Sequence, residues 1–195
     1  MRWSLLAVFA CGPMYAAPNA SPSPDPSPPS LGRTTDPGPS PSPMAEPAAA
    51  PKGMPAQFVA EHNAVRAKHC AGPLRWSPKL AAFAQRWANT LEAKGCRFGH
   101  SNGPYGENLA AGTIGALDPK GTVDYWYSEI KQYRFPDGGF SMDTGHFTQL
   151  VWRATTQVGC GHAQCNGNDI WVCEYDPPGN IDGEYRDNVK PAGCR

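Results

Sequence analysis

Two histidines and two glutamates in the second half of the chain have side chains that could share one polar site: His100, Glu107, Glu129 and His146. Two imidazoles and two carboxylates can bind Zn²⁺ and leave one position open for a water molecule, as in catalytic zinc sites. The same four groups can also form a hydrogen-bonded network without a metal. Because they are spread over 47 residues, their spacing does not choose between these arrangements, and separate surface positions are the default.

The local sequence predicts the elements that carry the two glutamates. Glu107 falls in residues 101–122, which are rich in Gly and Asn and are expected to form a loop with short helical pieces. Glu129 is expected on a helix, because the apolar residues around it recur at helical spacing. His100 and His146 each follow a glycine.

Two further helices and a hairpin are expected around these residues. Helical spacing of apolar residues predicts one helix over residues 57–69 and a second from the N-cap Ser77 to Gly95. Residues 157–165 and 170–175 flank an Asn-Gly-Asn-Asp turn, which is typical of a β-hairpin. Helices followed by a small antiparallel sheet indicate an α+β fold.

The first 55 residues differ in composition from the rest, because they hold 14 of the 22 prolines. Residues 1–17 carry a positive charge followed by a short apolar core, which is typical of an export signal. Residues 18–55 are rich in Pro and Ser and poor in large apolar side chains, so a disordered tether is expected. The remaining residues, 56–195, have a typical size for one folded domain.

Cys11 lies within the signal segment and allows two interpretations. The run Val8–Cys11 is similar to the processing site of bacterial lipoproteins, in which the cysteine is lipidated and becomes the mature N-terminus. Cleavage after Ala16 or Ala17 would instead remove it. A membrane is therefore expected as a partner only through such an anchor.

Six cysteines lie in the expected domain: Cys70, Cys96, Cys160, Cys165, Cys173 and Cys194. An even number in an exported domain indicates three disulfides. A zinc cluster is less favoured, because no Cys-x-x-Cys pair is present. Spacing alone does not choose among the fifteen possible sets of pairs. Cys165 and Cys173 lie on the two arms of the expected hairpin, and this proximity predicts a disulfide between them.

The charges argue against a nucleic-acid partner. The chain has 17 Lys and Arg and 17 Asp and Glu, so its formal net charge is zero. Nucleic-acid-binding proteins need a concentrated positive surface.

Four short motifs can be compared with a known family: His62–Arg66 (HNAVR), Gly106–Leu109 (GENL), Gly145–Trp152 (GHFTQLVW) and Cys173–Asn180 (CEYDPPGN). Together they resemble the signature motifs of the CAP superfamily, which includes cysteine-rich secretory proteins, antigen 5 and pathogenesis-related proteins of group one. The plant group-one type is the most similar. The resemblance covers about residues 56–182, nearly all of the expected domain.

The resemblance implies an α-β-α sandwich of the CAP (SCP-domain) type with a large central cleft. It assigns His100, Glu107, Glu129 and His146 to the cleft tetrad of the family, which is reported to bind divalent metal in some members. His100 and His146 would then hold zinc or another divalent ion together with Glu107 or Glu129.

The plant-type pattern also implies a disulfide between Cys96 and Cys160. Elimination then leaves Cys70 paired with Cys194, two cysteines that the plant pattern lacks.

The chain departs from the family pattern at two places near these motifs. Glu174 follows Cys173 where the family usually has Asn, Gln, His, Arg or Ser. Residues 133–145 lack the two cysteines of the plant proteins, so this loop is expected to be looser.

Three functions fit these observations. The first is a secreted or surface-tethered protein that binds a lipid, glycan or peptide in a cleft around the tetrad. The second is a metal-dependent hydrolase in which His100 and His146 activate a water and Glu107 or Glu129 acts as the base. The third is a structural module associated with a cell wall.

Limited proteolysis tests the division into tether and domain. Because the tether is expected to lack packed structure, proteases should cut between Ala17 and Met54 and leave a resistant core. A shortened chain that begins at Pro55 should unfold cooperatively, and loss of that cooperativity would contradict the division.

Overall fold

The computed structural model describes residues 52–194. The expected signal segment, Cys11 and nearly all of the expected tether lie outside these residues. Helix α1 (Met54–Lys68) begins within the range assigned to the tether, so the folded part starts two residues before residue 56.

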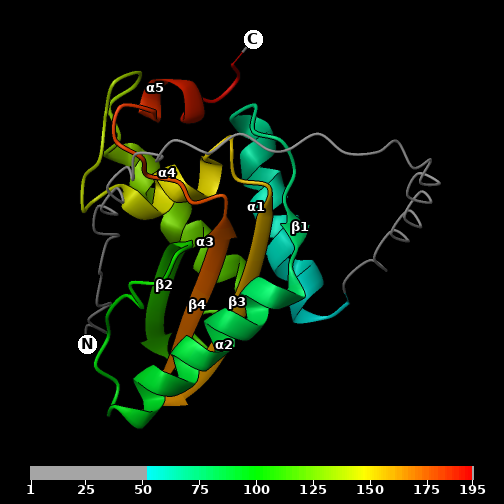
Figure 1. Cartoon of the computed structure of the whole chain (residues 1–195), viewed down its shortest axis with the longest axis vertical. Coiled ribbons are helices and arrows are strands. Elements are labelled where there is room, and N and C mark those ends of the chain that lie inside the picture. Colours follow the sequence, from blue (N-terminus) through cyan, green and yellow to red (C-terminus); the bar gives the residue numbers. More distant parts are fainter. Residues whose placement is uncertain (1–51, 195) are drawn as a thin grey trace, which may run out of the picture. The chain divides into compact units, whose positions relative to one another are not determined.

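A sheet of four strands forms the middle of the fold, in the order β1-β3-β4-β2 (Figure 1). Strands β3 (Gln157–Cys165) and β4 (Asn168–Asp176) form the expected hairpin. Strand β2 (Gly106–Thr113) pairs antiparallel with β4, and the short β1 (Arg75–Trp76) pairs parallel with β3. The sheet is therefore mixed rather than purely antiparallel.

Helix α2 (Pro78–Ala93) covers one face of this sheet (Figure 1). Its N-terminus is capped by the side chain of Ser77, as the sequence predicts. Gly159 and Gly161 lie beneath the helix on β3, and a Cβ atom at either position would collide with the α2 backbone. The two glycines thus allow the helix to lie directly on the strand.

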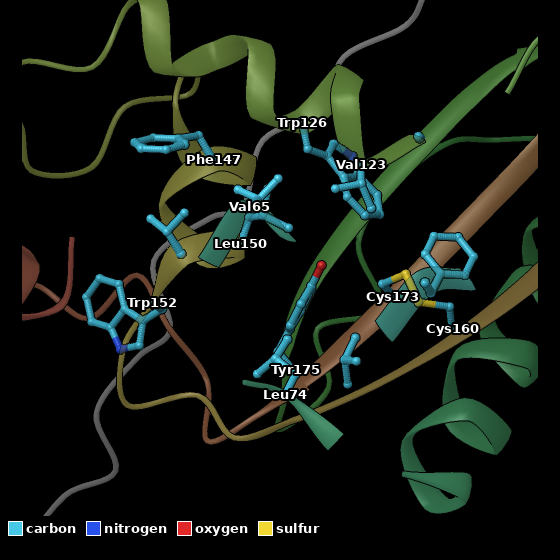
Figure 2. Packing of buried hydrophobic residues seen from close by; sticks show 14 of the residues in the cluster. Val65, Leu74, Val123, Trp126, Phe147, Leu150, Trp152, Cys160, Cys173 and Tyr175 are labelled. Atoms are coloured by element: carbon cyan, nitrogen blue, oxygen red, sulfur yellow. A yellow bond between two sulfur atoms is a disulfide. The ribbon is translucent and has the colours of Figure 1, made fainter. Parts of the chain in front are cut away.

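The other face of the sheet packs against a second group of helices. These are α1, α3 (Pro119–Tyr127), the 3-10 helix η1 (Ser128–Lys131) and α4 (Gly145–Val151). Figure 2 shows their core, in which Trp126 and Phe147 gather with Tyr175 of β4. A short helix, α5 (Tyr185–Asn188), follows the sheet. The expected α+β class and the α-β-α layering are confirmed.

The expected loop over residues 101–122 is wrong for its central part, which forms strand β2. The segment Gly-Glu-Asn-Leu-Ala-Ala-Gly-Thr has neither alternating polarity nor β-branched residues before its last position, so its own sequence does not favour a strand. All eight residues pair in register with β4, from Gly106 opposite Tyr175 to Thr113 opposite Asn168. Pairing with a neighbour therefore decides the conformation here.

The hairpin turn is shorter than expected. It consists of Asn166 and Gly167 alone, with φ values of 49° and 79°. Two consecutive residues with positive φ are the requirement of a type I′ turn, for which Asn-Gly is the preferred pair.

One of the three expected disulfides is confirmed and two are wrong. Cys70 pairs with Cys194, whereas the expected Cys96–Cys160 and Cys165–Cys173 bonds are replaced by Cys96–Cys165 and Cys160–Cys173.

Strand alternation explains the difference, because successive side chains point to opposite faces of a sheet. Cys160 lies directly opposite Cys173 in the hairpin register, with a Cα–Cα distance of 4.1 Å, and both side chains join the core on the α1 side (Figure 2). Cys165 has the parity of Gly159 and faces α2, where it reaches Cys96 after the end of that helix.

Substitution of Gly159 by Ala tests the close contact between α2 and β3. The added methyl group would meet backbone atoms of Ser77, Leu80 and Ala81, which cannot rotate away. We expect Gly159→Ala to lower the free energy of unfolding by about 3 kcal/mol in urea denaturation. Gly72→Ala is the control, since no atom lies within 4 Å of a Cβ placed there. Equal stability of the two variants would contradict this packing.

Candidate functional site

A chain of buried hydrogen bonds joins the four sequence motifs. His62 of α1 contacts the Phe58 carbonyl through Nδ1 (2.7 Å) and the Tyr175 hydroxyl through Nε2 (2.8 Å). The carbonyl can only accept, so Nδ1 carries the proton and Nε2 accepts from the hydroxyl. The Asn108 amide donates both to the Tyr175 hydroxyl and to the His146 carbonyl. Burial lowers the pKa of His62 to about 4, so its ring is neutral at pH 7.

Arg66, which lies on α1 like His62, fixes the end of α4. Its guanidinium is fully buried and donates to four backbone carbonyls, those of Gly72, Leu150, Trp152 and Thr155. Burial lowers the pKa of Arg66 to about 10, so the group stays charged at neutral pH. His62 and Arg66 thus both serve to hold elements of the fold together.

Glu129 holds His146 and the first turn of α4. Its Oε1 lies 2.6 Å from His146 Nδ1, and its Oε2 accepts from the backbone N–H groups of His146 and Phe147. The imidazole is fully buried and stacks on the indole of Trp126. Glu129 lies on η1, directly after the helix that was expected to carry it.

Glu107 holds His100 in the same way. Its Oε1 lies 2.5 Å from His100 Nδ1, and the backbone N–H of Ser101 donates to both carboxylate oxygens. Burial alone would raise the pKa of Glu107, but hydrogen bonds from His100, Glu174 and Ser101 outweigh it and hold that pKa below its usual value. Glu107 therefore stays ionised at neutral pH.

Glu174 is a further acidic residue of this site that the sequence reasoning did not assign to it. It lies directly opposite Glu107 in the pairing of β2 with β4, and it is fully buried. Burial and the negative charge of Glu107 raise the pKa of Glu174 to about 10, so at neutral pH it is an uncharged acid that can share its proton with Glu107. The signal was visible in the sequence, as the acidic residue after Cys173 where the family has other residues.

The structure brings the four predicted residues together as two separate pairs. Glu107 belongs to the row of side chains that includes Gly159 and faces α2, whereas its neighbour Asn108 contacts His146 on the other side of the sheet. Within residues 52–194, no group of three or more His, Cys, Asp or Glu side chains is placed to hold a metal ion. Convergence of all four on one point stays a prediction.

The described residues fit a metal only in part. In both pairs Nδ1 is held by a carboxylate while Nε2 is buried without a hydrogen-bond partner among the described residues. This is the orientation that metal-ligating histidines show. Catalytic zinc sites, however, use three protein ligands, and each pair offers one imidazole, so we derive no metal-dependent step from this arrangement.

The neutral state of Glu174 can be tested with Glu174→Gln. Between pH 4.5 and 10 the folded protein binds one more proton at this position than the unfolded chain, so wild-type stability falls as pH rises through this range. The amide cannot ionise and removes this loss. We expect the variant to match the wild type near pH 4 and to exceed it by roughly 2–4 kcal/mol at pH 7.5. Glu92→Gln, on the exposed side of α2, is the control. A stability difference that does not change with pH would contradict the assignment.

Comparison with known proteins places these motifs in a family. A family model described as "CAP: Cysteine-rich secretory protein family" matches residues 59–175. Protein PRY2 of Saccharomyces cerevisiae is 47% identical over 136 residues, which are 68% of this chain and 40% of that protein. Repressed by EFG1 protein 1 of Candida albicans is 47% identical over 146 residues, 69% of this chain and 53% of that protein. The chain thus spans about half or less of these two fungal relatives.

Plant relatives and solved structures agree with this match. Pathogenesis-related protein 1 of Arabidopsis thaliana is 42% identical over 124 residues, 63% of this chain and 76% of that protein. The crystal structure of hookworm platelet inhibitor superposes with a TM-score of 0.61 at 22% identity, covering 75% of this chain and 84% of that one. Venom allergen-like protein 4 of Schistosoma mansoni gives 0.57 at 26% identity, covering 72% and 97%. The fold, the motifs and these matches agree, and the chain belongs to the cysteine-rich secretory protein (CAP) family.

Proposed function

We propose that this protein is a ligand-binding CAP module that acts outside the cell and recognises its ligand through the imidazoles of His100 and His146. The supporting observation is that the Nε2 atoms of both imidazoles are buried and have no hydrogen-bond partner among residues 52–194. Buried polar atoms are nearly always hydrogen-bonded. When its proton lies on Nδ1 and is directed at the carboxylate, each ring offers Nε2 as an acceptor.

An acceptor of this kind selects ligands that carry hydrogen-bond donors. Among the expected ligand classes, a glycan has hydroxyl groups and a peptide has N–H groups, whereas the hydrocarbon part of a lipid has neither. Glycans and peptides are therefore favoured. The competing hydrolase needs both imidazoles at one metal-bound water, and their convergence on one point stays a prediction.

A location outside the cell agrees with the chemistry of the domain. Three disulfides link the described residues, and disulfides persist in oxidising compartments. The family is described as secretory. Among residues 52–194 no helix is long and apolar enough to cross a membrane. Lipidation of Cys11 stays a prediction.

Alanine variants of the two histidines test the proposal. The full chain, with His100→Ala and His146→Ala variants, would be applied to glycan and peptide arrays and to phosphatidylcholine vesicles, each with and without chelator. We expect a glycan or peptide bound by the wild type to be bound at least about tenfold more weakly by each variant. Each variant loses one hydrogen bond between the ligand and an imidazole that a carboxylate holds in place.

His162→Ala is the matched control, since His162 also pairs with a carboxylate, that of Asp169, but uses Nε2 to do so. Thermal unfolding of each variant separates loss of binding from loss of folding. Ligands bound equally by all variants would contradict the proposed role of the imidazoles. Turnover of a substrate that chelator abolishes and Zn²⁺ restores would favour the hydrolase instead.

A further inference from the structure

Positive charge is concentrated in residues 75–105, which include β1, α2 and the loop that leads to β2. This stretch holds five Lys and Arg but one Asp or Glu, whereas residues 106–194 hold six and twelve. The formal net charge of zero is thus the sum of a positive and a negative part of the chain. The five cations form no ion pair with another described residue: Arg75, Lys79, Arg86, Lys94 and Arg97.

Three of these cations share one flank of α2. Lys79, Arg86 and Lys94 are seven and eight residues apart, and each of these steps is close to two turns of an α-helix. Their side chains therefore start from the same flank, at intervals of about 10–12 Å along the helix axis. All three residues are exposed, and Lys94 is the C-cap residue of the helix.

Each of the three cations lies near a half-buried aromatic ring. The distances to the ring centres are 5.8 Å for Lys79 and Tyr105, 5.6 Å for Arg86 and Phe83, and 5.7 Å for Lys94 and Trp87. A ring attracts a cation through its electron-rich face but carries no net charge, so it does not neutralise the cation as a carboxylate would. The three positive charges are thus held in place and stay available to an anion outside the chain.

The loop between α2 and β2 fixes the three rings. Trp87 donates a hydrogen bond from Nε1 to the Gly99 carbonyl, at 2.9 Å. The rings of Phe83 and Tyr105 pack edge to face, 5.3 Å apart. Gly103 lies so close to Phe83 that a Cβ atom there would collide with the ring. The cations therefore rest on a fixed aromatic surface.

The spacing of the cations distinguishes between kinds of polyanion. A nucleic acid carries one phosphate about every 3.4 Å of each strand, which is much denser than the cations of this flank. Proteins that bind a membrane surface combine cations with apolar side chains that enter the lipid. The exposed large apolar side chains of the described residues are Ile114, Met142 and Ile181, and none of them belongs to residues 75–105. A chain of sugars with an acidic group on some of its rings has a sparser charge.

We propose that the flank of α2 formed by Lys79, Arg86 and Lys94 binds an acidic polysaccharide, whose carboxylate or sulfate groups pair with the three cations. The sugar rings between its acidic groups span the intervals between the cations. The proposed function concerns a ligand held by the imidazoles of His100 and His146. Binding by charge on this flank goes beyond that function and does not depend on it.

Titration calorimetry of the full chain with oligosaccharides tests this surface. Heparin oligosaccharides carry sulfate, oligogalacturonate carries carboxylate, and dextran is uncharged. We expect at least one of the two acidic oligosaccharides to bind, more weakly as salt is added, and dextran not to bind. The triple variant Lys79→Gln/Arg86→Gln/Lys94→Gln should bind that oligosaccharide at least about tenfold more weakly, because it loses three charge pairs.

The matched control is Lys120→Gln/Lys131→Gln/Arg134→Gln, which removes the same charge from α3, from η1 and from the segment after η1. It should bind as tightly as the wild type. His100→Ala and His146→Ala should also leave this binding intact, which separates the surface from the proposed function.

Thr90→Lys tests the same surface by a gain of binding. Thr90 lies on the same flank, four residues after Arg86 and four before Lys94, so the variant adds a fourth cation between them. We expect it to bind the acidic oligosaccharide about threefold more tightly than the wild type.

Oligothymidylate and phosphatidylserine vesicles serve as the two other kinds of polyanion. The inference is overturned if neither acidic oligosaccharide binds, or if either of these polyanions binds more tightly than both. It is also overturned if the triple variant binds no more weakly than the matched control, or if Thr90→Lys binds no more tightly than the wild type.

Discussion

The hydroxyl of Tyr175 is the point at which the four motifs of the fold meet. It donates to His62 of α1 and accepts from Asn108 of β2, whose amide also reaches the backbone of His146 in α4. All these groups are buried. If one element shifted, each group would lose its hydrogen-bond partner and could not bond to water instead. The network therefore fixes the register of β2 against β4 and the position of α4 above them. The placement of both His/Glu pairs depends on this register.

Neighbouring residues of β4 serve opposite faces of the sheet because of strand alternation. Tyr175 belongs to the core beneath α1 and α3, whereas Glu174 faces α2 opposite Glu107. Strand β4 thus supplies both the hydroxyl that organises the fold and the neutral acid opposite Glu107, the carboxylate that holds His100. Two buried carboxyls side by side are tolerated because one of them keeps its proton.

Helices α1, α2 and α3 and the hairpin could be predicted from local sequence, whereas the parts that were predicted wrongly depend on distant pairing. Helix α2 follows from Ser77, Pro78 and a regular apolar stripe, and it is observed where expected. Strand β2 could not be predicted in this way, because its eight residues are extended only through their pairing with β4. The disulfide error has its origin in strand alternation. Cys165 and Cys173 face opposite sides of the sheet, whereas Cys160 lies directly opposite Cys173 on the same side.

The candidate site shows the same limit of local reasoning. His100 and Glu107 are seven residues apart, and Glu129 and His146 seventeen, and nothing in these spacings indicates that they form carboxylate–imidazole pairs. The family resemblance identified the residues but not their division into two pairs. Glu174 was noticed as a departure from the family, and its meaning became clear only from the strand opposite.

The bond between Cys70 and Cys194 has a consequence for how proteases act on this domain. Its two ends are 124 residues apart, so almost the whole domain after α1 lies inside one covalent ring. A protease that cuts a single peptide bond anywhere between these cysteines opens the ring but releases no fragment. The two pieces stay joined and packed around the same sheet, and a nicked molecule separates only after reduction.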